Sequence, residues 1–485
     1  MAISSIYKIP LALLTDLYQL TMAQGYWTCG AREHEAVFHL FFRRHPFRGG
    51  YSLFAGLDYV ADFLEDFRFG AEDITYLGQL NGADGKPLFK QGFLDYLGGL
   101  KLSCQVDAVA EGSVVFPNAP LLRVQGSLIE CQLLETALLN MVNFQTLIAT
   151  KASRIVAAAE GDPVMDFGLR RAQGIDGSLS ASRAAWLGGC VATSNVLAGR
   201  LFGIPPKGTH AHSWILAFDS EEVAFRTYAE AMPNNCIFLV DTYDSLQGVG
   251  KAIAIGRELQ QKGHQMLGIR LDSGDLAQLS IKARKMLDDA GFPKARIVAS
   301  NDLDEYEVLA LKKKGAAIDT WGVGTRLVTA YDQPALGGVY KLAAIRAPGA
   351  PWSYRLKLSE EKIKVSNPGV QQVRRYRKGK RFVADVIYNM EQGIDDGRCV
   401  LPDGEMRIPD YDSHQDLLQP LFAAGECVQE RVPLEDARSF AQEQLASLDE
   451  RFRSIHEPAT YPIGLDHQMA ELKDQLIRAA GKEPV

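Results

Sequence analysis

The sequence predicts an α/β fold, with an incomplete α/β barrel of about seven parallel strands in the central part of the chain. Between residues 164 and 345 one pattern recurs: a short β-branched run, a polar turn and a helical stretch. Runs such as 237–240 (IFLV) are apolar throughout, as in strands that are covered on both faces. Repeated β-α units of this kind are typical of a barrel or of a doubly wound sheet.

The strands are expected in order at residues 164–168, 207–212, 236–243, 266–272, 296–301, 317–324 and 338–345. Helical patterns fill most of the intervals, as at 245–261 and 275–289. Polar side chains close each of the first six strands. A barrel places its chemistry at the carboxyl ends of several strands, whereas a doubly wound sheet concentrates it at one switch point. The distribution therefore favours the barrel.

The segments that flank the barrel are expected to form a second α/β domain. A β-rich segment at 102–128 precedes a long helical stretch at 132–158, with which the barrel domain begins. The stretch 346–351, rich in proline and glycine, marks the end of the barrel. We predict that the N- and C-terminal parts pack together beside it. The expected segments are 1–131 for the N-terminal part, 132–345 for the barrel and 346–485 for the C-terminal part.

The composition excludes several classes of protein. The chain has 485 residues, of which 47% are hydrophobic and 23% charged, as in an ordinary globular enzyme. Its formal charge of -7 argues against a nucleic-acid partner, and the basic run 374–381 is interpreted as a solvated hairpin turn. No apolar run reaches the roughly 20 residues that span a bilayer. We expect no membrane partner and, without a secretory pattern at the start, a cytoplasmic location.

The cysteines are also typical of a protein without structural disulfides. The seven cysteines are scattered, and no two of them form a CxxC pair. An odd number of scattered cysteines predicts neither a disulfide framework nor a zinc knuckle.

Two histidines, His210 and His212, stand two residues apart within residues 208–213 (GTHAHS). The pair can hold a metal, one histidine can be a nucleophile that accepts and passes on a group, or a histidine can simply have a backbone partner inside the barrel. A zinc site needs further nitrogen ligands from later strands. Between His212 and His414 the sequence has only His264, in a turn that should lie at the opposite end of the barrel. A metal hydrolase is therefore disfavoured.

Other groups at the strand ends suit a phosphorylated sugar. Arg170, Arg171 and Arg270 supply forked donors for phosphate or carboxylate oxygens. The backbone of residues 322–325 (GVGT) has little steric cover, which is common where barrels hold a phosphate.

Four aspartates at the strand ends supply hard oxygens for Mg²⁺, which prefers a few carboxylates together with waters and substrate phosphates. They are Asp241, Asp244, Asp272 and Asp275. Each can instead cap the helix that follows it, and for Asp244 and Asp275 capping is at least as good an interpretation.

Five segments resemble the nicotinate phosphoribosyltransferase family, and they occur in the family's order. They are 15–22 (TDLYQLTM), 167–174 (FGLRRAQG), 193–199 (TSNVLAG), 208–213 (GTHAHS) and 270–276 (RLDSGDL). The resemblance implies that nicotinate and phosphoribosyl pyrophosphate give nicotinate mononucleotide and pyrophosphate in NAD biosynthesis, with Mg²⁺ and coupled ATP hydrolysis. It also implies an incomplete barrel beside an α/β domain, and a homodimer with shared active sites.

The resemblance also implies roles for individual residues. His212 corresponds to the histidine that ATP phosphorylates, and Asp241 and Asp272 are candidate magnesium ligands through the substrate. Tyr18, reaching across the dimer, and Phe167 would hold the pyridine ring. The implied substrate-binding residues are Tyr18, Phe167, Arg170, Ser194, Thr209, Arg270, Gly324 and Thr325.

Three alternatives to nicotinate transfer stay open at this point. Related nicotinamide-specific enzymes carry an aspartate where Ser194 stands, and a carboxylate there would repel the carboxylate of nicotinate. Quinolinate phosphoribosyltransferases share the fold, but they need more cations for a second carboxylate and lack the phosphorylated histidine. A non-catalytic nucleotide sensor would bind the same ligands without releasing pyrophosphate.

Overall fold

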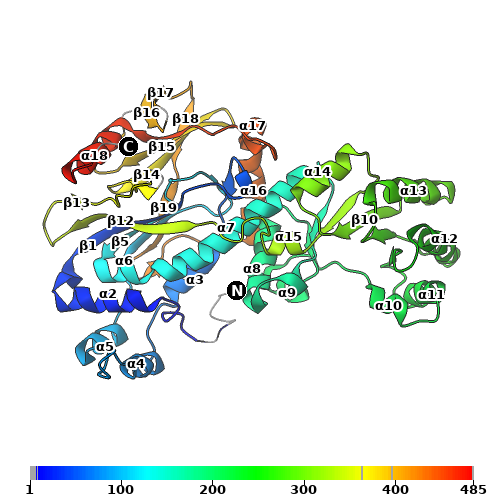
Figure 1. Ribbon diagram of the computed structural model, residues 1–485, viewed down its shortest axis with the longest axis horizontal. Coiled ribbons are helices and arrows are strands. Elements are labelled where there is room, and N and C mark those ends of the chain that lie inside the picture. The colour runs from blue at the N-terminus through cyan, green and yellow to red at the C-terminus, as the bar shows by residue number, and fades with distance from the viewer. Residues whose placement is uncertain (1–6, 8, 362–363, 395–396, 403, 483–485) are drawn as a thin grey trace. The chain divides into compact units, whose positions relative to one another are not determined.

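A computed structural model describes residues 7, 9–361, 364–394, 397–402 and 404–482 of the chain. The chain divides into two compact units (Figure 1). Unit 1 comprises Met1–Leu147 and Ala335–Val485, and unit 2 comprises Ile148–Pro334. The long helix α7 (Glu135–Ala158) begins in unit 1 and ends in unit 2. Within the described ranges, no helix combines the length and the apolar character that crossing a bilayer requires.

Unit 2 is built on a six-stranded parallel sheet with the order β7-β6-β11-β10-β9-β8. Its strands are β6 (Val164–Asp166), β7 (Ala192–Thr193), β8 (Ile237–Leu239), β9 (Gly268–Leu271), β10 (Arg296–Asn301) and β11 (Thr320–Val323). Phe238, Ile269 and Ile297 on these strands are fully buried. This is the burial expected of a parallel sheet with both faces covered.

Helices occupy the intervals between these strands. They are α8 (Gly174–Leu187), α9 (Val196–Phe202), α10 (His212–Leu216), α11 (Glu221–Ala231), α12 (Ser245–Gln261), α13 (Leu276–Asp289), α14 (Glu305–Lys313) and α15 (Thr325–Val328). The aspartates Asp244, Asp275 and Asp304 begin three of them by accepting backbone N–H groups of the first turn. The capping interpretation of Asp244 and Asp275 is thus confirmed.

Five of the predicted strands lie in this sheet as β6, β8, β9, β10 and β11, but the strand predicted at 207–212 is wrong. The chain from Pro205 to Lys207 only bridges to β7: the Thr193 N–H donates to the Pro205 carbonyl at 3.2 Å, and the Lys207 N–H donates to the Thr193 carbonyl at 2.9 Å. Pro205 and Pro206 have no N–H groups to donate, so a regular ladder cannot form through them. The short strand β7 takes the place of that strand at the edge of the sheet.

The strand predicted at 338–345 exists as β12 (Gly338–Arg346), but it does not belong to the parallel sheet. It pairs antiparallel with β1 (Glu35–Phe42) in unit 1. Unit 2 accordingly ends at Pro334, earlier than the expected limit of 345. Only Tyr340, Ala343 and Ala344 of β12 are buried, and apolar content alone does not distinguish that environment from a barrel strand.

Unit 1 contains two larger sheets. The first is antiparallel with the order β13-β12-β1-β5-β3-β19-β20, and the second has the order β17-β16-β21-β15-β14-β18. The strands not yet given bounds are β3 (Gln105–Val109), β5 (Leu122–Ser127), β13 (Ser353–Tyr354), β14 (Gln371–Lys378), β15 (Arg381–Asn389), β16 (Arg398–Leu401), β17 (Gly404–Arg407), β18 (Ser413–Asp416), β19 (Leu418–Ala423), β20 (Glu426–Cys427) and β21 (Ile463–Asp466). Because β19 pairs with β3, segments from both ends of the chain share one sheet.

Two short strands pair separately, and helices complete unit 1. The strands are β2 (Ser52–Leu53) and β4 (Val114–Val115). The helices are α2 (Leu17–Thr28), α3 (Leu57–Glu65), α4 (Ala71–Gly78), α5 (Gln91–Gly98), α6 (Leu128–Leu133), α16 (Leu434–Ser447), α17 (Glu450–Arg453) and α18 (His467–Ala479).

The basic run 374–381 is a hairpin, as predicted, formed by β14 and β15. It is not simply solvated. Arg375 is fully buried, and its guanidinium donates to the Asp385 carboxylate at 2.7 and 2.9 Å. Arg374 pairs with Asp416 at 2.8 Å. A buried arginine needs such a carboxylate partner, so these two cations serve the packing of unit 1.

Candidate active site

The candidate site lies at the carboxyl end of the parallel sheet in unit 2, where several strands deliver polar side chains to one edge. Asp166 is the last residue of β6, and its buried carboxylate accepts three hydrogen bonds of 2.8 Å, from the Gly168 N–H, the Ser182 hydroxyl and the Thr193 hydroxyl. Burial raises the pKa of Asp166, and these hydrogen bonds act in the opposite direction. Asp166 thereby ties the turn after β6 to α8 and β7.

The turn held by Asp166 carries Phe167. The Phe167 N–H donates to the Val323 carbonyl at 2.8 Å, which extends the pairing of β6 with β11. The Phe167 ring packs against Gly322 so closely that a Cβ atom at Gly322 would lie 2.6 Å from it. Gly322 is therefore required by this ring, a reason distinct from the phosphate-binding one that the sequence indicated.

Two other predicted residues, Ser194 and Gly324, lie beside this turn, and a third, Thr325, follows Gly324. The Ser194 N–H donates to the Asp166 carbonyl at 2.8 Å, directly after β7. Gly324 precedes the one-turn helix α15, and a Cβ atom there would lie 3.2 Å from the Phe167 carbonyl. Thr325 begins α15 and is partly exposed. Phe167, Ser194 and Gly324 therefore lie close together around the end of β6.

His212 is the first residue of α10, and its imidazole lies between groups that follow two different strands. Its Nδ1 is 3.1 Å from the Thr242 hydroxyl, which follows β8. Its Nε2 is 3.9 Å from the Asp272 carboxylate, which follows β9. The His212 side chain is 40% exposed, so a ligand can reach it. The imidazole is accessible and, among the described residues, has a hydrogen-bond partner at Nδ1 only, an arrangement that suits a histidine that accepts a group.

Asp241 and Asp272 form a linked pair next to His212. One oxygen of Asp241 accepts the Asp272 N–H at 2.8 Å and the Ser273 hydroxyl at 2.7 Å. Asp272 in turn accepts a hydrogen bond from the Ser300 hydroxyl at the end of β10. The structure thus brings both predicted magnesium ligands to one place.

Arg270 on β9 lies 3.8 Å from the Asp272 carboxylate. Burial lowers the pKa of Arg270, the charges of Asp272 and Asp241 oppose that shift, and Arg170 adds to it. Arg170 itself is exposed on a short 3-10 helix, Leu169–Arg171. The cationic end of Arg270 is therefore partly sheltered from water, where an anion would be bound more strongly.

Three predicted residues carry buried polar atoms that have no hydrogen-bond partner among the described residues: Thr209 Oγ1, Asp241 Oδ1 and Arg270 Nε. Buried polar groups in folded proteins are nearly always paired. Asp241 and Arg270 lie at neighbouring strand ends and Thr209 lies in the loop before α10, and a polar ligand could pair with these unpaired donors and acceptors. They make this edge of the sheet the candidate binding site.

Tyr18 is the one predicted substrate-binding residue in unit 1. It lies on α2 with its side chain 49% exposed. Burial of part of the ring raises its pKa, as does the charge of Glu135. Its role in the site stays a prediction.

Sequence reasoning missed Ser182 and Ser300, which support Asp166 and Asp272. Ser182 lies within α8 and Ser300 lies within β10, one residue before the strand ends. Serines are common in both kinds of position, so no local signal separates them from others. Thr242 was visible, because it stands next to Asp241 directly after a predicted strand.

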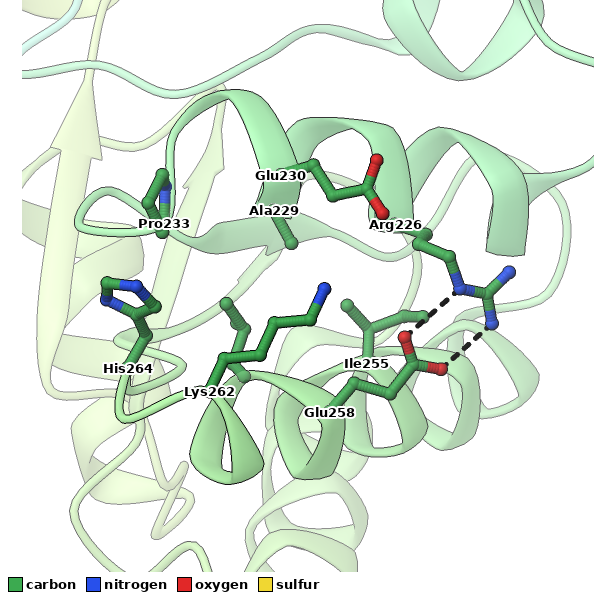
Figure 2. Close-up of a pocket in the computed structure, with 9 residues that line it drawn as sticks. Arg226, Ala229, Glu230, Pro233, Ile255, Glu258, Lys262 and His264 are labelled. Carbon is green, nitrogen blue, oxygen red and sulfur yellow. Dashed lines mark hydrogen bonds and ion pairs between the residues drawn. The ribbon is translucent and has the colours of Figure 1, made fainter.

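A separate hollow of about 180 Å³ lies between α11 and α12 (Figure 2). It is lined by Arg226, Ala229, Glu230, Pro233, Ile255, Glu258, Leu259, Lys262 and His264. Arg226 donates to Glu258 at 2.9 and 3.1 Å, so its charge is already compensated. His264 is thus part of a hollow that contains none of the predicted site residues. Nor does any group of three or more His, Cys, Asp or Glu in the described part of the chain have an arrangement that could hold a metal ion.

The six-stranded parallel sheet and the antiparallel sheets define a mixed α/β protein with a polar edge at the carboxyl ends of the parallel strands. Family models match almost the whole chain: the N-terminal domain model of nicotinate phosphoribosyltransferase matches residues 13–143, the family model 163–349 and the C-terminal domain model 371–473. The chain belongs to the nicotinate phosphoribosyltransferase family.

Individual relatives agree with the family models. The nicotinate phosphoribosyltransferase of Bacillus subtilis is 43% identical over 475 residues, covering 96% of this chain and 95% of the relative. That of Bos taurus is 36% identical over 536 residues, with 96% of each chain covered. The crystal structure of human nicotinic acid phosphoribosyltransferase matches with a TM-score of 0.83 and 32% identity, over 95% of this chain and 99% of that chain.

A further likeness bears on the fold alone. The crystal structure of nicotinate-nucleotide pyrophosphorylase from Pyrococcus furiosus matches with a TM-score of 0.70 at 22% identity, over 90% of this chain and 96% of that chain. Because the family models show the chain to be a member of the nicotinate phosphoribosyltransferase family, the alternative of a metal hydrolase is excluded.

Proposed function

We propose that the protein transfers the phosphoribosyl group of phosphoribosyl pyrophosphate to nicotinate, giving nicotinate mononucleotide and pyrophosphate for NAD salvage. The observation that carries this proposal is the match of three consecutive family models over residues 13–473. The structure supports it through the unpaired buried atoms of Thr209, Asp241 and Arg270. In this interpretation the six-stranded sheet is an incomplete barrel with edges at β7 and β8.

The reaction needs no general base. The nitrogen of the pyridine ring of nicotinate already carries a free lone pair at neutral pH, and it forms a bond to the anomeric carbon as the bond from that carbon to pyrophosphate breaks. Negative charge then grows on the departing pyrophosphate. Preorganised cations stabilise such charge, and Arg270 and Arg170 are two cations at this edge of the sheet.

The residues at this edge fit a magnesium ion bound together with the substrate. Asp241 Oδ1 is buried without a partner among the described residues, and Asp272 lies next to it in the chain of hydrogen bonds. Carboxylate oxygens of this kind would hold Mg²⁺ through the substrate. When bound, the ion would neutralise part of the charge on pyrophosphate.

His212 is the proposed acceptor of the γ-phosphoryl group of ATP. A bond from an imidazole nitrogen to the γ-phosphorus forms as the bond to the bridging oxygen breaks, and ADP leaves with that oxygen. Water later cleaves the N–P bond and releases phosphate. Thr242 at Nδ1 fixes the orientation of the ring for this step.

The pyridine ring is proposed to lie against Phe167, with Tyr18 of a second copy on its other face in a homodimer. Flat aromatic rings favour this offset stacking. Arg270 and Thr209 would receive the carboxylate of nicotinate, and Thr325 with Gly324 the ribose phosphate. Ser194, next to the Asp166 turn, leaves out the negative charge that an aspartate would bring close to that carboxylate.

Two assays test the proposal. The first measures pyrophosphate release with nicotinate, nicotinamide and quinolinate in parallel, each with and without ATP, and we expect nicotinate to be the preferred substrate. Absence of pyrophosphate release with all three would leave the nucleotide sensor as the better interpretation.

The second assay incubates the protein with γ-labelled ATP and maps the label. We expect an acid-labile label on His212 that is lost in His212→Ala. An acid-stable label, or a label retained by that variant, would contradict the phosphohistidine without touching the transfer reaction itself.

A further inference from the structure

We propose that His210 is a positioning residue that accepts a backbone hydrogen bond at the free edge of β8 and thereby holds His212 in place. The inference rests on the proposed phosphorylation of His212. It concerns the second histidine of the pair, for which packing alone would be the simplest explanation. Three observations argue for more than packing.

The first observation is where the chain before His212 is attached. On one side, Pro205 and Lys207 bond to Thr193 of β7 through the backbone. On the other side, toward β8, the attachments are made through side chains. The Leu239 N–H donates to His210 Nε2 at 3.3 Å, and the Asn235 amide donates to the Gly208 carbonyl at 3.2 Å.

Leu239 is the last residue of β8, and in a parallel ladder its N–H would bond to a strand carbonyl. The His210 ring provides the acceptor in place of that carbonyl. Because Ala211 and His212 follow directly and begin α10, this bond fixes the start of the helix that carries His212. Thr242, three residues after Leu239 in the sequence, is the hydrogen-bond partner of His212 Nδ1. The same stretch of chain therefore contacts both histidines.

The second observation is the state of the His210 ring. It is 8% exposed and packs among aromatic rings, with the Tyr228 centroid at 4.9 Å and that of Phe225 at 6.1 Å. Burial lowers the pKa of His210 to about 4, so the ring is neutral near neutral pH. A neutral ring has one nitrogen free to accept a hydrogen bond, and Nε2 is the one used.

The third observation is the cost of keeping a histidine at this position. Because Nε2 accepts a hydrogen bond, the proton of the neutral ring is on Nδ1. Nδ1 is buried and has no well-formed hydrogen bond among the described residues, although the backbone of Ala211 lies close enough to oppose part of the fall in the pKa of the ring. An unpaired buried N–H is unfavourable. A phenylalanine would fill the same aromatic surroundings without that group. Packing alone would therefore be better served by phenylalanine.

The experiment compares His210→Phe, which keeps the packing and removes the acceptor, with His210→Gln, whose amide oxygen restores an acceptor near the position of Nε2. His264→Phe is the matched control, since His264 lines the separate hollow between α11 and α12. Two quantities are measured on the full chain. They are the rate of labelling of His212 by γ-labelled ATP and the hydrogen exchange of the Leu239 amide.

We expect His210→Phe to melt close to the wild-type protein but to label His212 about tenfold more slowly, because small displacements of a reacting group are costly. The Leu239 amide should exchange faster in this variant. His210→Gln should recover much of both properties, and His264→Phe should change neither.

Labelling by His210→Phe at the wild-type rate would overturn the inference, and so would a protected Leu239 amide in that variant. Slow labelling that His210→Gln does not recover would also overturn it, because the acceptor would then not be the cause. If the wild-type protein takes up no label, the phosphohistidine itself is overturned. Exchange at Leu239 would still decide whether His210 holds the segment.

Discussion

Replacing Gly322 by alanine should weaken nicotinate binding through the Phe167 ring. A Cβ atom at Gly322 would lie 2.6 Å from this ring, whereas ordinary contacts begin near 3.4 Å. The ring must therefore retreat by the difference, about 0.8 Å, or the strands β6 and β11 must separate. The two strands are hydrogen-bonded to each other on both sides of the contact, so the ring should be the part that moves.

The size of the effect follows from two contributions. Overpacking of this kind costs about 1–3 kcal/mol of stability. A displaced ring forfeits an aromatic stacking contribution of about 0.5–1.5 kcal/mol, which is about two- to tenfold in affinity. We therefore expect the KM for nicotinate to rise about two- to tenfold, with a smaller change in the KM for phosphoribosyl pyrophosphate.

The assay is steady-state pyrophosphate release at varied nicotinate, with urea unfolding measured in parallel. Gly250→Ala is the matched control, because Gly250 lies in α12 and a Cβ atom there would meet nothing within 4 Å. That change should leave both KM values alone and stabilise the helix by about 0.5–1 kcal/mol. An unchanged KM for nicotinate in a stably folded Gly322→Ala protein would refute the position given to the pyridine ring.

Three other predictions follow from the same contacts. Asp166→Ala removes the acceptor of three hydrogen bonds and should lower the free energy of unfolding, measured in urea, by about 2–4 kcal/mol. The control Asp244→Ala, which removes a helix cap, should lower it by about 1 kcal/mol. Equal losses in the two variants would contradict the proposed role of Asp166. Folding lowers the pKa of His210 from 6.5 to about 4, so between these pH values the unfolded chain binds a proton that the folded chain does not. The free energy of unfolding should therefore fall by about 3 kcal/mol as the pH drops from 6.5 to 4. Chemical denaturation of His210→Phe should show a flatter dependence on pH in this range. Ser194→Asp should weaken the use of nicotinate and raise that of nicotinamide in competition assays, and an unchanged preference would show that Ser194 does not discriminate.

The repeated β-α pattern located most of the parallel sheet, because apolar strands buried on both faces leave a strong local signal. Strands β6, β8, β9, β10 and β11 all lie within predicted segments. The two failures have different causes. At 207–212 the regular β-α pattern predicted a strand, but the chain there bonds to β7 only next to Pro205 and Pro206, which have no N–H groups with which to continue a ladder. At 338–345 the strand is real, and only its partner β1, far away in the sequence, assigns it to unit 1.

The candidate site divides in the same way. Asp241, Arg270 and Asp272 were visible because polar residues directly after apolar strands must gather at one edge of a parallel sheet. Ser182 and Ser300 were not visible, because their role depends on which carboxylate they meet across the sheet. The requirement for glycine at 322 was attributed to a phosphate, whereas the contact in the structure is with Phe167.

The sequence alone thus determined the α/β class and the polar residues that follow the parallel strands, since these depend on local periodicity and residue chemistry. The scarcity of later histidines disfavoured a zinc site, and the family resemblance made His212 the candidate phosphoryl acceptor. Only the tertiary structure decided what His212 and His210 contact. Nδ1 of His212 meets Thr242 and its Nε2 lies near Asp272, whereas His210 accepts the Leu239 N–H. Two histidines in one short motif have the same local signal, and their partners lie on or directly after strands about 30 residues or more away in the sequence, so only folding brings them together.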